Sequence, residues 1–357
     1  MVKSNRYLFQ LNHPAHFHLF KNLINELKKR GHQVKITIKQ KDVLKALLDE
    51  AGWTYENIAP NYRKNKTVAI LKSLYDRDKK LLQIVREFQP NLMLGTSPEI
   101  GHISLVTRIP SFFFGEDDVN LSKRMYAGAL LCYPFFTRII SPNGCNNKQW
   151  NSKTVFYPGY QKLAYLHPNW FKANQTVTGI KKPYFILRFS ELNAYHDKNK
   201  SGISYDVAQK LIEILKPNGN ILISSEGTLH PNFKKYEFSG AKSEMHNLMA
   251  NSDMIIADSQ SMIVESAMLG IPNIRFNNFA GKISVLNELE NRYKLTRSIS
   301  SEKEALLYKT VKEFLKPETK SSYINYRNQM LQDKTDVTHF FIELCENYDQ
   351  IDSYKSK

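Results

Sequence analysis

The chain has 357 residues, 42% of them hydrophobic and 24% charged, a composition typical of a globular protein long enough for two domains. Its formal net charge of +16 arises from 50 Lys and Arg against 34 Asp and Glu, and it favours anionic partners such as phosphorylated substrates or acidic lipid headgroups. The three cysteines are far apart and form no CxxC or Cys/His pattern, which argues against a disulfide framework or structural zinc and indicates a cytoplasmic protein.

The first half of the chain alternates strand-like and helix-like segments. An apolar run at 7–11 is followed by a helix whose apolar residues share one face, and an alternating strand at 33–38 completes a βαβ unit typical of a parallel sheet. Further helices are predicted at 42–51, 67–88 and 100–108, and further strands at 91–94, 111–114 and 138–141.

An apolar stretch covers residues 125–140, but Pro134 interrupts it and it is too short to span a bilayer. Its first part, 125–131, follows Lys123 and Arg124, a pattern that suits peripheral contact with an acidic membrane at its inner face. We favour the other interpretation, a buried helix of the first domain.

The second half repeats the alternation. Residues 142–183 have weak periodicity, and we place a linker at 161–183, between an N-terminal domain at 1–160 and a C-terminal domain at 184–320. Strands are predicted at 184–187, 220–224, 254–257 and 272–276, helices at 207–215, 244–250 and 261–269, and a helical tail from about residue 302. Two βα series predict an α/β fold of two doubly wound, Rossmann-like domains with ligands at the carboxyl ends of their strands.

Three polar turns of the first half carry candidate catalytic residues. The turn at 12–18 holds three histidines at a helix N-terminus, which attracts anions and favours a neutral imidazole that can act as a general base. The other two turns place carboxylates directly after buried strands, where charge is costly unless it is used. The candidates are His16, His18, Glu99, Glu116 and Asp117. Helix capping or a solvated turn is the alternative, and the histidine spacing defines no metal site.

Polar turns of the second half predict a nucleotide-sugar site. A guanidinium after the first strand suits a diphosphate, and the loop 258–261 opens a helix whose N–H groups can bind one. Glu265 lies one turn further on the same helix face, where its carboxylate can accept two ribose hydroxyls. The candidates are Arg188, Ser190, His196, Asp197, Ser224, Glu226, Ser259, Gln260, Ser261 and Glu265. An ordinary polar loop remains the alternative for the pair at 196–197, and a helix cap for Ser261.

These motifs resemble a known family. Segment 258–272 is similar to the donor-site segment of GT-B glycosyltransferases and non-hydrolysing UDP-N-acetylglucosamine 2-epimerases, and the whole chain resembles the DUF354 family within that epimerase and MurG-type superfamily. The matching stretches are 13–21, 30–32, 97–99, 187–190, 196–197, 224–227, 265–267 and 269–272. The resemblance implies a GT-B fold, two Rossmann-like domains facing across a cleft. It also implies that Glu265 binds ribose, that the 259–261 turn faces the diphosphate, and that helices at 321–357 pack back on the N-terminal domain.

Three functions are open at this stage. The first is a metal-independent glycosyltransferase without a cofactor, which uses a nucleotide-sugar donor, with UDP as the expected nucleotide, and a glycan or lipid-linked acceptor in surface polysaccharide assembly. The second is a sugar-nucleotide 2-epimerase, because Glu116 falls where epimerases carry a functional glutamate, although the loop 95–97 lacks their aspartate. The third is a non-catalytic binding protein of a glycan pathway, which the many polar strand ends disfavour. Nucleic acid is not an expected partner, since no nucleic-acid-binding module occurs.

Overall fold

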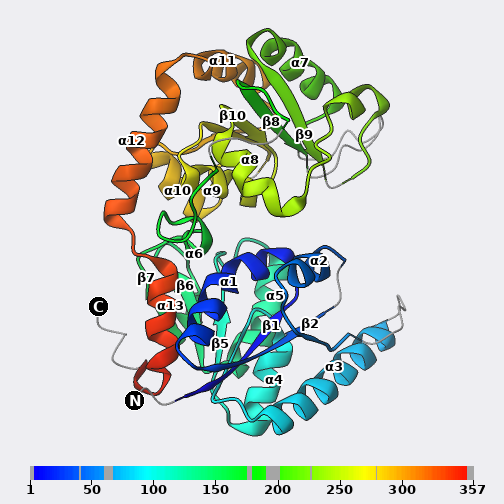
Figure 1. The fold of residues 1–357 in the computed structure, drawn as a ribbon, viewed down its shortest axis with the longest axis vertical. Helices are drawn as coiled ribbons and strands as arrows, with labels where there is room; N and C mark the ends of the chain where they lie inside the picture. Colours follow the sequence, from blue (N-terminus) through cyan, green and yellow to red (C-terminus); the bar gives the residue numbers. More distant parts are fainter. Residues whose placement is uncertain are drawn as a thin grey trace. The chain divides into compact units, whose positions relative to one another are not determined.

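The structure is a computed structural model that describes residues 4–39, 42–59, 67–174, 179–189, 202–225, 227–278 and 280–351. The chain divides into two compact α/β units (Figure 1). Unit 1 comprises Met1–Trp170 and Thr335–Lys357, and unit 2 comprises Phe171–Lys334. No helix in the described ranges has both the length and the hydropathy that crossing a bilayer requires.

Among its described residues, unit 1 has a seven-stranded parallel sheet of order β3-β2-β1-β4-β5-β6-β7. The strands are β1 (Arg6–Leu11), β2 (Gln33–Ile38), β3 (Glu56–Asn57), β4 (Leu92–Gly95), β5 (Ser111–Phe114), β6 (Arg138–Pro142) and β7 (Thr154–Tyr157). The helices are α1 (Pro14–Lys29), α2 (Asp42–Glu50), α3 (Thr67–Phe88), α4 (Pro98–Thr107), α5 (Lys123–Cys132), α6 (Leu163–Leu166) and α13 (Val337–Glu346), with short 3-10 turns η1 (Tyr133–Phe135) and η2 (Lys148–Lys153). The strand order reverses between β1 and β4, and ligands bind doubly wound sheets at such a switch point.

In the described part of unit 2, five parallel strands form a sheet of order β12-β11-β10-β8-β9. They are β8 (Tyr184–Phe189), β9 (Asn220–Ser225), β10 (Met254–Ala257), β11 (Asn273–Phe276) and β12 (Arg297–Ile299). The helices are α7 (Tyr205–Leu215), α8 (Met245–Asn251), α9 (Gln260–Leu269), α10 (Ser284–Asn291), α11 (Glu304–Phe314) and α12 (Glu318–Asp333), with 3-10 turns η3 (Lys216–Asn218), η4 (Pro231–Tyr236) and η5 (Lys242–Glu244). The switch point of this sheet lies between β8 and β10.

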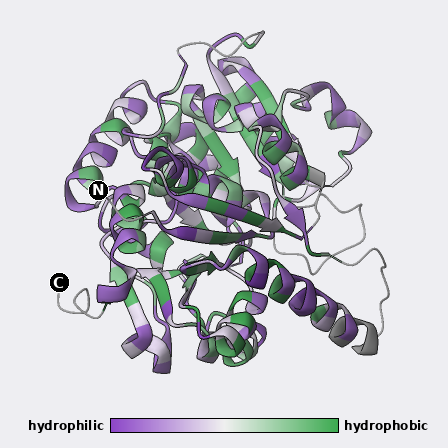
Figure 2. Cartoon of the chain, turned by 60° about the horizontal axis from the view of Figure 1, so that its bottom comes forward, coloured by the Kyte–Doolittle hydropathy of each residue, from purple (hydrophilic) through white to green (hydrophobic). Residues whose placement is uncertain are grey.

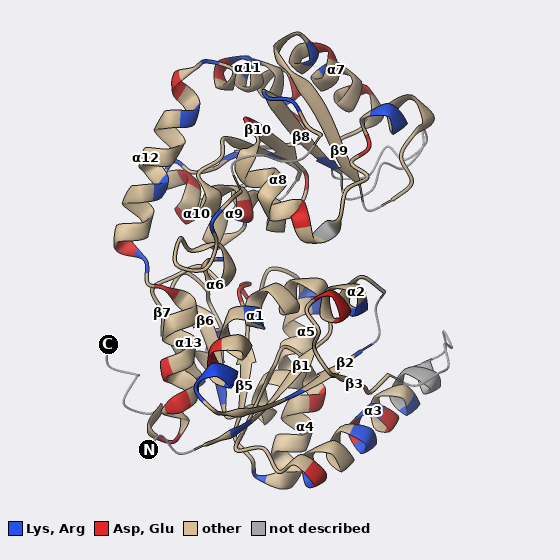
Figure 3. Ribbon diagram, in the orientation of Figure 1, with Lys and Arg blue, Asp and Glu red and all other residues tan. Residues whose placement is uncertain are grey.

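The central strands are buried on both faces, as parallel sheets covered by helices require. In β1 every residue from Tyr7 to Leu11 has no exposed surface. In unit 2 one cluster of buried apolar residues joins the sheet to α7 and α11, and a second joins it to α8 and α9. Hydrophobic residues accordingly gather on the strands and on the inner sides of helices (Figure 2), whereas charged residues lie mainly on helices and loops (Figure 3).

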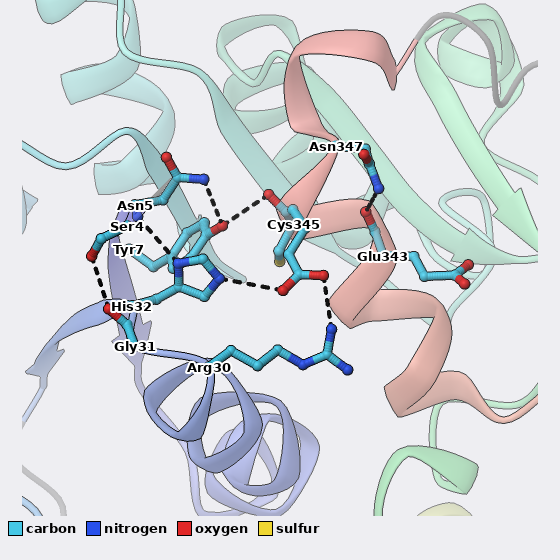
Figure 4. Close-up of polar contacts among 10 residues, drawn as sticks. Ser4, Asn5, Tyr7, Arg30, Gly31, His32, Glu343, Cys345 and Asn347 are labelled. Atoms are coloured by element: carbon cyan, nitrogen blue, oxygen red, sulfur yellow. Dashed lines mark hydrogen bonds and ion pairs between the residues drawn. The ribbon is translucent and has the colours of Figure 1, made fainter. Parts of the chain in front are cut away.

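The last helix, α13, belongs to unit 1 and is tied to the start of the chain (Figure 4). The hydroxyl of Tyr7 donates to the carbonyl of Cys345 at 3.1 Å. Glu346 accepts from Arg30 at 2.9 Å and lies 3.3 Å from Nε2 of His32, whose ring is buried. These contacts hold the end of α13 against β1 and the end of α1.

Apolar packing holds the same helix along its length. The ring of Phe341 is fully buried and meets Phe114 and Tyr157 edge-on, with centroids 4.9 and 5.3 Å away. A Cβ at Gly159 would lie 2.6 Å from a methyl group of Val337, so only glycine permits this close approach.

The unit boundaries differ from the sequence prediction. The linker expected at 161–183 contains α6, whose four residues are all buried in unit 1. The return to unit 1, expected at 321, begins at Thr335, because α12 packs on unit 2. There Nε of Arg327 donates to the carbonyl of Met268 at 2.6 Å, and Lys320 pairs with Asp253 at 2.8 Å.

A second difference concerns α5, for which the preferred interpretation was a buried helix. Of the described residues of α5, Ala129 and Cys132 alone are buried. Leu130 and Leu131 expose 48% and 71% of their surface. The preference for burial is therefore wrong, because apolar composition does not distinguish a core helix from one with an apolar outer face.

Candidate functional site

In unit 2, polar groups gather at the carboxyl ends of β8, β9 and β10. Arg188 in β8 donates from Nη1 to the hydroxyl of Ser224 in β9 at 2.9 Å. The backbone N–H of Asp258, directly after β10, donates to the carbonyl of Arg188 at 3.3 Å. Because β8 pairs with both β9 and β10, these three residues lie together at the carboxyl-terminal ends of neighbouring strands.

Helix α9 begins at the same edge, directly after Asp258. Its N-cap, Ser259, has an extended backbone, and among the described residues its side chain makes no capping hydrogen bond. The first turn carries no acidic residue, Gln260 is partly exposed and Ser261 is exposed. The N–H groups and the positive dipole end of such a helix suit a phosphate group.

Glu265 lies in the second turn of α9 and is paired with a histidine from α8. Its Oε1 is 3.4 Å from Nε2 of His246, and the two side chains are 15% and 9% exposed. Phe171 meets the His246 ring edge-on, with centroids 6.4 Å apart. The sequence did not point to His246, because a single histidine in a short helix has no motif around it.

In unit 1, His16 lies in the first turn of α1, where His13 is the N-cap. The backbone N–H of Asn12 donates to Nδ1 of His16 at 3.1 Å. The hydroxyl of Thr96, after β4, lies 3.0 Å from Nε2 and 3.1 Å from Nδ1. Because Nδ1 accepts the Asn12 N–H, the neutral ring carries its proton on Nε2 and acts as a donor there.

Glu116 follows β5 and is held by a buried lysine. Its Oε1 is 2.8 Å from Nζ of Lys162, and the two side chains are 27% and 4% exposed. The next residue, Asp117, is half-buried, and the side chain of Asp118 accepts from the backbone N–H of Asn146 at 2.8 Å. Lys162 was missed from the sequence because it lies in the segment interpreted as a linker.

The sheet order β1-β4-β5 places His16, Thr96 and Glu116 at the carboxyl-terminal ends of three neighbouring strands of unit 1. Strands one position apart in a sheet are about 4.8 Å apart, so β1 and β5 are separated by about 10 Å. Two predicted catalytic residues, His16 and Glu116, therefore lie at the same edge. His18 packs instead against the rings of Phe17 and Tyr165, with centroids 5.4 and 5.5 Å away.

Glu99 has a different environment, with no exposed surface. Its Oε1 is 2.8 Å from Nζ of Lys39 and 2.6 Å from Nε of Arg77. Burial by itself raises the pKa of Glu99, but the Lys39 ammonium and local hydrogen bonds lower the pKa to about 2. A fully buried and strongly acidic carboxylate suits an ion pair that holds α3 and α4, so we do not retain the catalytic prediction for Glu99.

Four predicted nucleotide-binding residues, Ser190, His196, Asp197 and Glu226, lie outside the described residues. Within the described ranges, no group of three or more His, Cys, Asp and Glu side chains is arranged to hold a metal ion.

Two doubly wound α/β units, each with polar groups at the carboxyl edge of a parallel sheet, define a protein of the GT-B fold class, as the sequence predicted. The chain belongs to the DUF354 family, described as a protein of unknown function, which matches residues 8–341. No curated protein sequence matches the chain.

Solved structures share this fold at low sequence identity. The UDP-GlcNAc 2-epimerase from Neisseria meningitidis bound to UDP-GlcNAc superposes with a TM-score of 0.70 at 14% identity, covering 96% of this chain and 100% of that one. The UDP complex of MnaA from S. aureus has a TM-score of 0.68 at 12% identity, covering 97% of each chain. The spinosyn forosaminyltransferase SpnP has a TM-score of 0.61 at 10% identity, covering 98% of this chain and 99% of that one. These likenesses establish the fold.

Proposed function

We propose that the protein is a glycosyltransferase that binds a nucleotide-sugar donor in unit 2. The observation that carries the proposal is the grouping of Arg188, Ser224 and the N-terminus of α9 at one sheet edge. Helix N–H groups and a guanidinium are the donors that a diphosphate accepts best. Glu265, one turn further along α9, adds a carboxylate for the ribose hydroxyls, and His246 holds it by its Oε1.

Uridine is the nucleoside we expect. Two of the similar solved structures contain UDP or UDP-GlcNAc, and their fold is shared over nearly the whole chain. The acceptor in this proposal is a glycan or a lipid-linked glycan, in surface polysaccharide assembly.

Unit 1 supplies the groups that act on the acceptor. Glu116 is the carboxylate that we propose as the base, which takes the proton of the acceptor hydroxyl as its oxygen attacks the anomeric carbon. The bond from that carbon to the diphosphate oxygen breaks, and Arg188 with the N-terminus of α9 stabilises the leaving charge. His16 carries its proton on Nε2, which faces the Thr96 hydroxyl at 3.0 Å, so His16 is not the base in this scheme. The scheme uses no metal ion.

A sugar-nucleotide 2-epimerase is the second candidate. Glu116, with its buried partner Lys162, follows the strand after which epimerases carry a functional glutamate. Several similar structures are UDP-GlcNAc 2-epimerases, with TM-scores of 0.70 and 0.72 among them. In this reaction Glu116 would take a proton from the sugar carbon whose configuration inverts, and a proton would return to the opposite face of that carbon.

Calorimetric titration with UDP and UDP-sugars, beside GDP and CMP relatives, tests the donor site. We expect Glu265→Ala to weaken binding of the preferred nucleotide about 10- to 100-fold, because a hydrogen bond to a charged group contributes about 1.5–3 kcal/mol. Glu302→Ala, at an exposed residue of the same unit, is the matched control and should bind as the wild type does.

Each outcome discriminates between the functions. Unchanged affinity in Glu265→Ala would remove this residue from the site, and a wild-type protein that binds no nucleotide would contradict the donor assignment and favour a non-catalytic role. If a nucleotide sugar binds, incubating it alone separates the two enzymes: a new nucleotide sugar identifies an epimerase, and product formation only with an acceptor identifies a transferase.

A further inference from the structure

Unit 1 has an exposed apolar face formed by α4, α5 and η1, which we name the α4–α5 face. Leu105 and Val106 at the end of α4 are 64% and 65% exposed, and Leu130 and Leu131 at the end of α5 are 48% and 71% exposed. No charged residue occurs between Arg124 and Arg138. Soluble proteins rarely leave several large aliphatic side chains exposed together unless the surface binds something.

Contacts between the elements make this face continuous. η1 follows α5 directly, and its Phe135 packs on α4: a Cβ at Gly101 would lie 3.0 Å from the Cβ of Phe135. The ring of His102 meets Phe135 with centroids 5.4 Å apart. Leu105 lies one turn beyond Gly101 on the same side of α4, so the exposed ends of α4 and α5 border η1 together.

The surroundings of the α4–α5 face are basic. Lys123 and Arg124 at the start of α5 and Arg108 at the end of α4 are exposed. Lys153 donates from Nζ to the carbonyls of Tyr133 and Pro134 in η1, at 3.3 and 2.8 Å.

Acidic residues are scarce in the same region. Residues 100–115 and 119–138 contain no Asp or Glu, and Figure 3 shows the acidic residues of unit 1 on elements such as α2, α3 and α13. Asp78 of α3 borders the face, where its carboxylate lies 2.9 Å from Nδ1 of His102.

We propose that the α4–α5 face docks on a membrane surface that contains acidic lipids. Apolar side chains surrounded by Lys and Arg are the pattern of peripheral membrane binding, in which the aliphatic groups enter the headgroup boundary and the cations pair with lipid phosphates. The net charge of +16 adds long-range attraction to the same surface. This surface shares no residue with the proposed nucleotide site, so the inference stands whether or not the proposed reaction is correct.

Sedimentation of the full chain with vesicles tests the proposal. Vesicles of phosphatidylcholine alone are compared with vesicles that also contain phosphatidylglycerol, and we expect the wild-type protein to bind the second kind only. Leu105→Gln with Leu131→Gln should weaken this binding about tenfold or more, because two aliphatic side chains leave the lipid boundary. Ile324→Gln, at a residue of α12 that is 44% exposed, is the matched control and should bind normally.

A charge reversal beside the α4–α5 face provides a second test in the same vesicle-binding experiment. Lys123→Glu with Arg124→Glu should weaken binding about 30-fold or more, since each basic residue near an acidic surface strengthens binding about fivefold. Lys234→Glu with Lys235→Glu, at exposed residues of η4 in unit 2, changes the net charge equally and should have a much smaller effect. If both double charge reversals weaken vesicle binding equally, net charge alone accounts for the attraction. That result would overturn the assignment to this face. Absence of vesicle binding by the wild type, with self-association lost in the Leu105→Gln and Leu131→Gln variant, would assign the face to a second copy of the chain instead.

Discussion

Lys39→Met with Arg77→Met should lower the free energy of unfolding by about 3–5 kcal/mol at neutral pH, because it leaves a buried carboxylate without its cations. Glu99 has no exposed surface, and Nζ of Lys39 and Nε of Arg77 lie 2.8 and 2.6 Å from its Oε1. Both cations are partly exposed, with side chains 27% and 18% accessible, so removing them leaves no comparable defect elsewhere.

In the same variant, the contribution of Glu99 to folding stability should also change with acid in the opposite direction from the wild type. In the wild type the pKa of Glu99 is about 2, below an unfolded value of about 4.3, so its contribution is present above that value and is lost as the pH falls toward 2. Without the cations, burial raises the pKa of Glu99 above the unfolded value, and protonation then stabilises the folded state. The difference in stability between the two proteins should therefore shrink as the pH is lowered from about 7 to about 4.

Urea unfolding at a series of pH values measures both effects. Adding Glu99→Gln to the double variant removes the titrating group, so this triple variant should lose the acid-dependent gain and serves as the control. A stability difference that stays constant with pH would contradict the buried ion pair as the source of the effect.

The regular elements were predictable wherever periodicity was strong. The first βαβ unit combines a short apolar strand, a helix with one apolar face and cations in its last turn, and an alternating strand, and β1, α1 and β2 form as expected. The missed strands β3, β7 and β12 have two, four and three residues, too few for a period of two to stand out. Their strand conformation depends on a neighbouring strand, which a local pattern does not show.

The candidate sites, too, were only partly predictable from the sequence. Polar positions near strand ends were identifiable because buried strands followed by polar residues show in the sequence, and Arg188, Glu116 and Glu265 became candidates in this way. Ser224 was a candidate as well, but its pairing with Arg188 was not foreseen, and Lys162, the partner of Glu116, was missed, because these pairs join residues 36 and 46 positions apart. Such pairs depend on which strands become neighbours, and sequence spacing does not reveal that order.

Glu116→Gln is expected to lower turnover by about 10²- to 10⁴-fold while leaving nucleotide affinity nearly unchanged, because a general base acts in the chemical step and the proposed nucleotide site lies in unit 2. The expectation holds for the transferase and for the epimerase alike. Glu56→Gln is the matched control, since Glu56 also accepts from a lysine, Lys35 at 2.7 Å, but lies in β3, away from the β1-β4-β5 edge.

Loss of stability must be separated from loss of chemistry. Glu116→Gln leaves Lys162, with a side chain only 4% exposed, without its carboxylate, and this should destabilise unit 1 by about 1–3 kcal/mol. Adding Lys162→Met removes the unpaired ammonium and should restore most of that stability, because replacing both partners avoids a buried uncompensated charge. Turnover should stay low in the double variant, since the base is still missing. Recovery of turnover together with stability would show that Glu116 holds the fold and takes no proton.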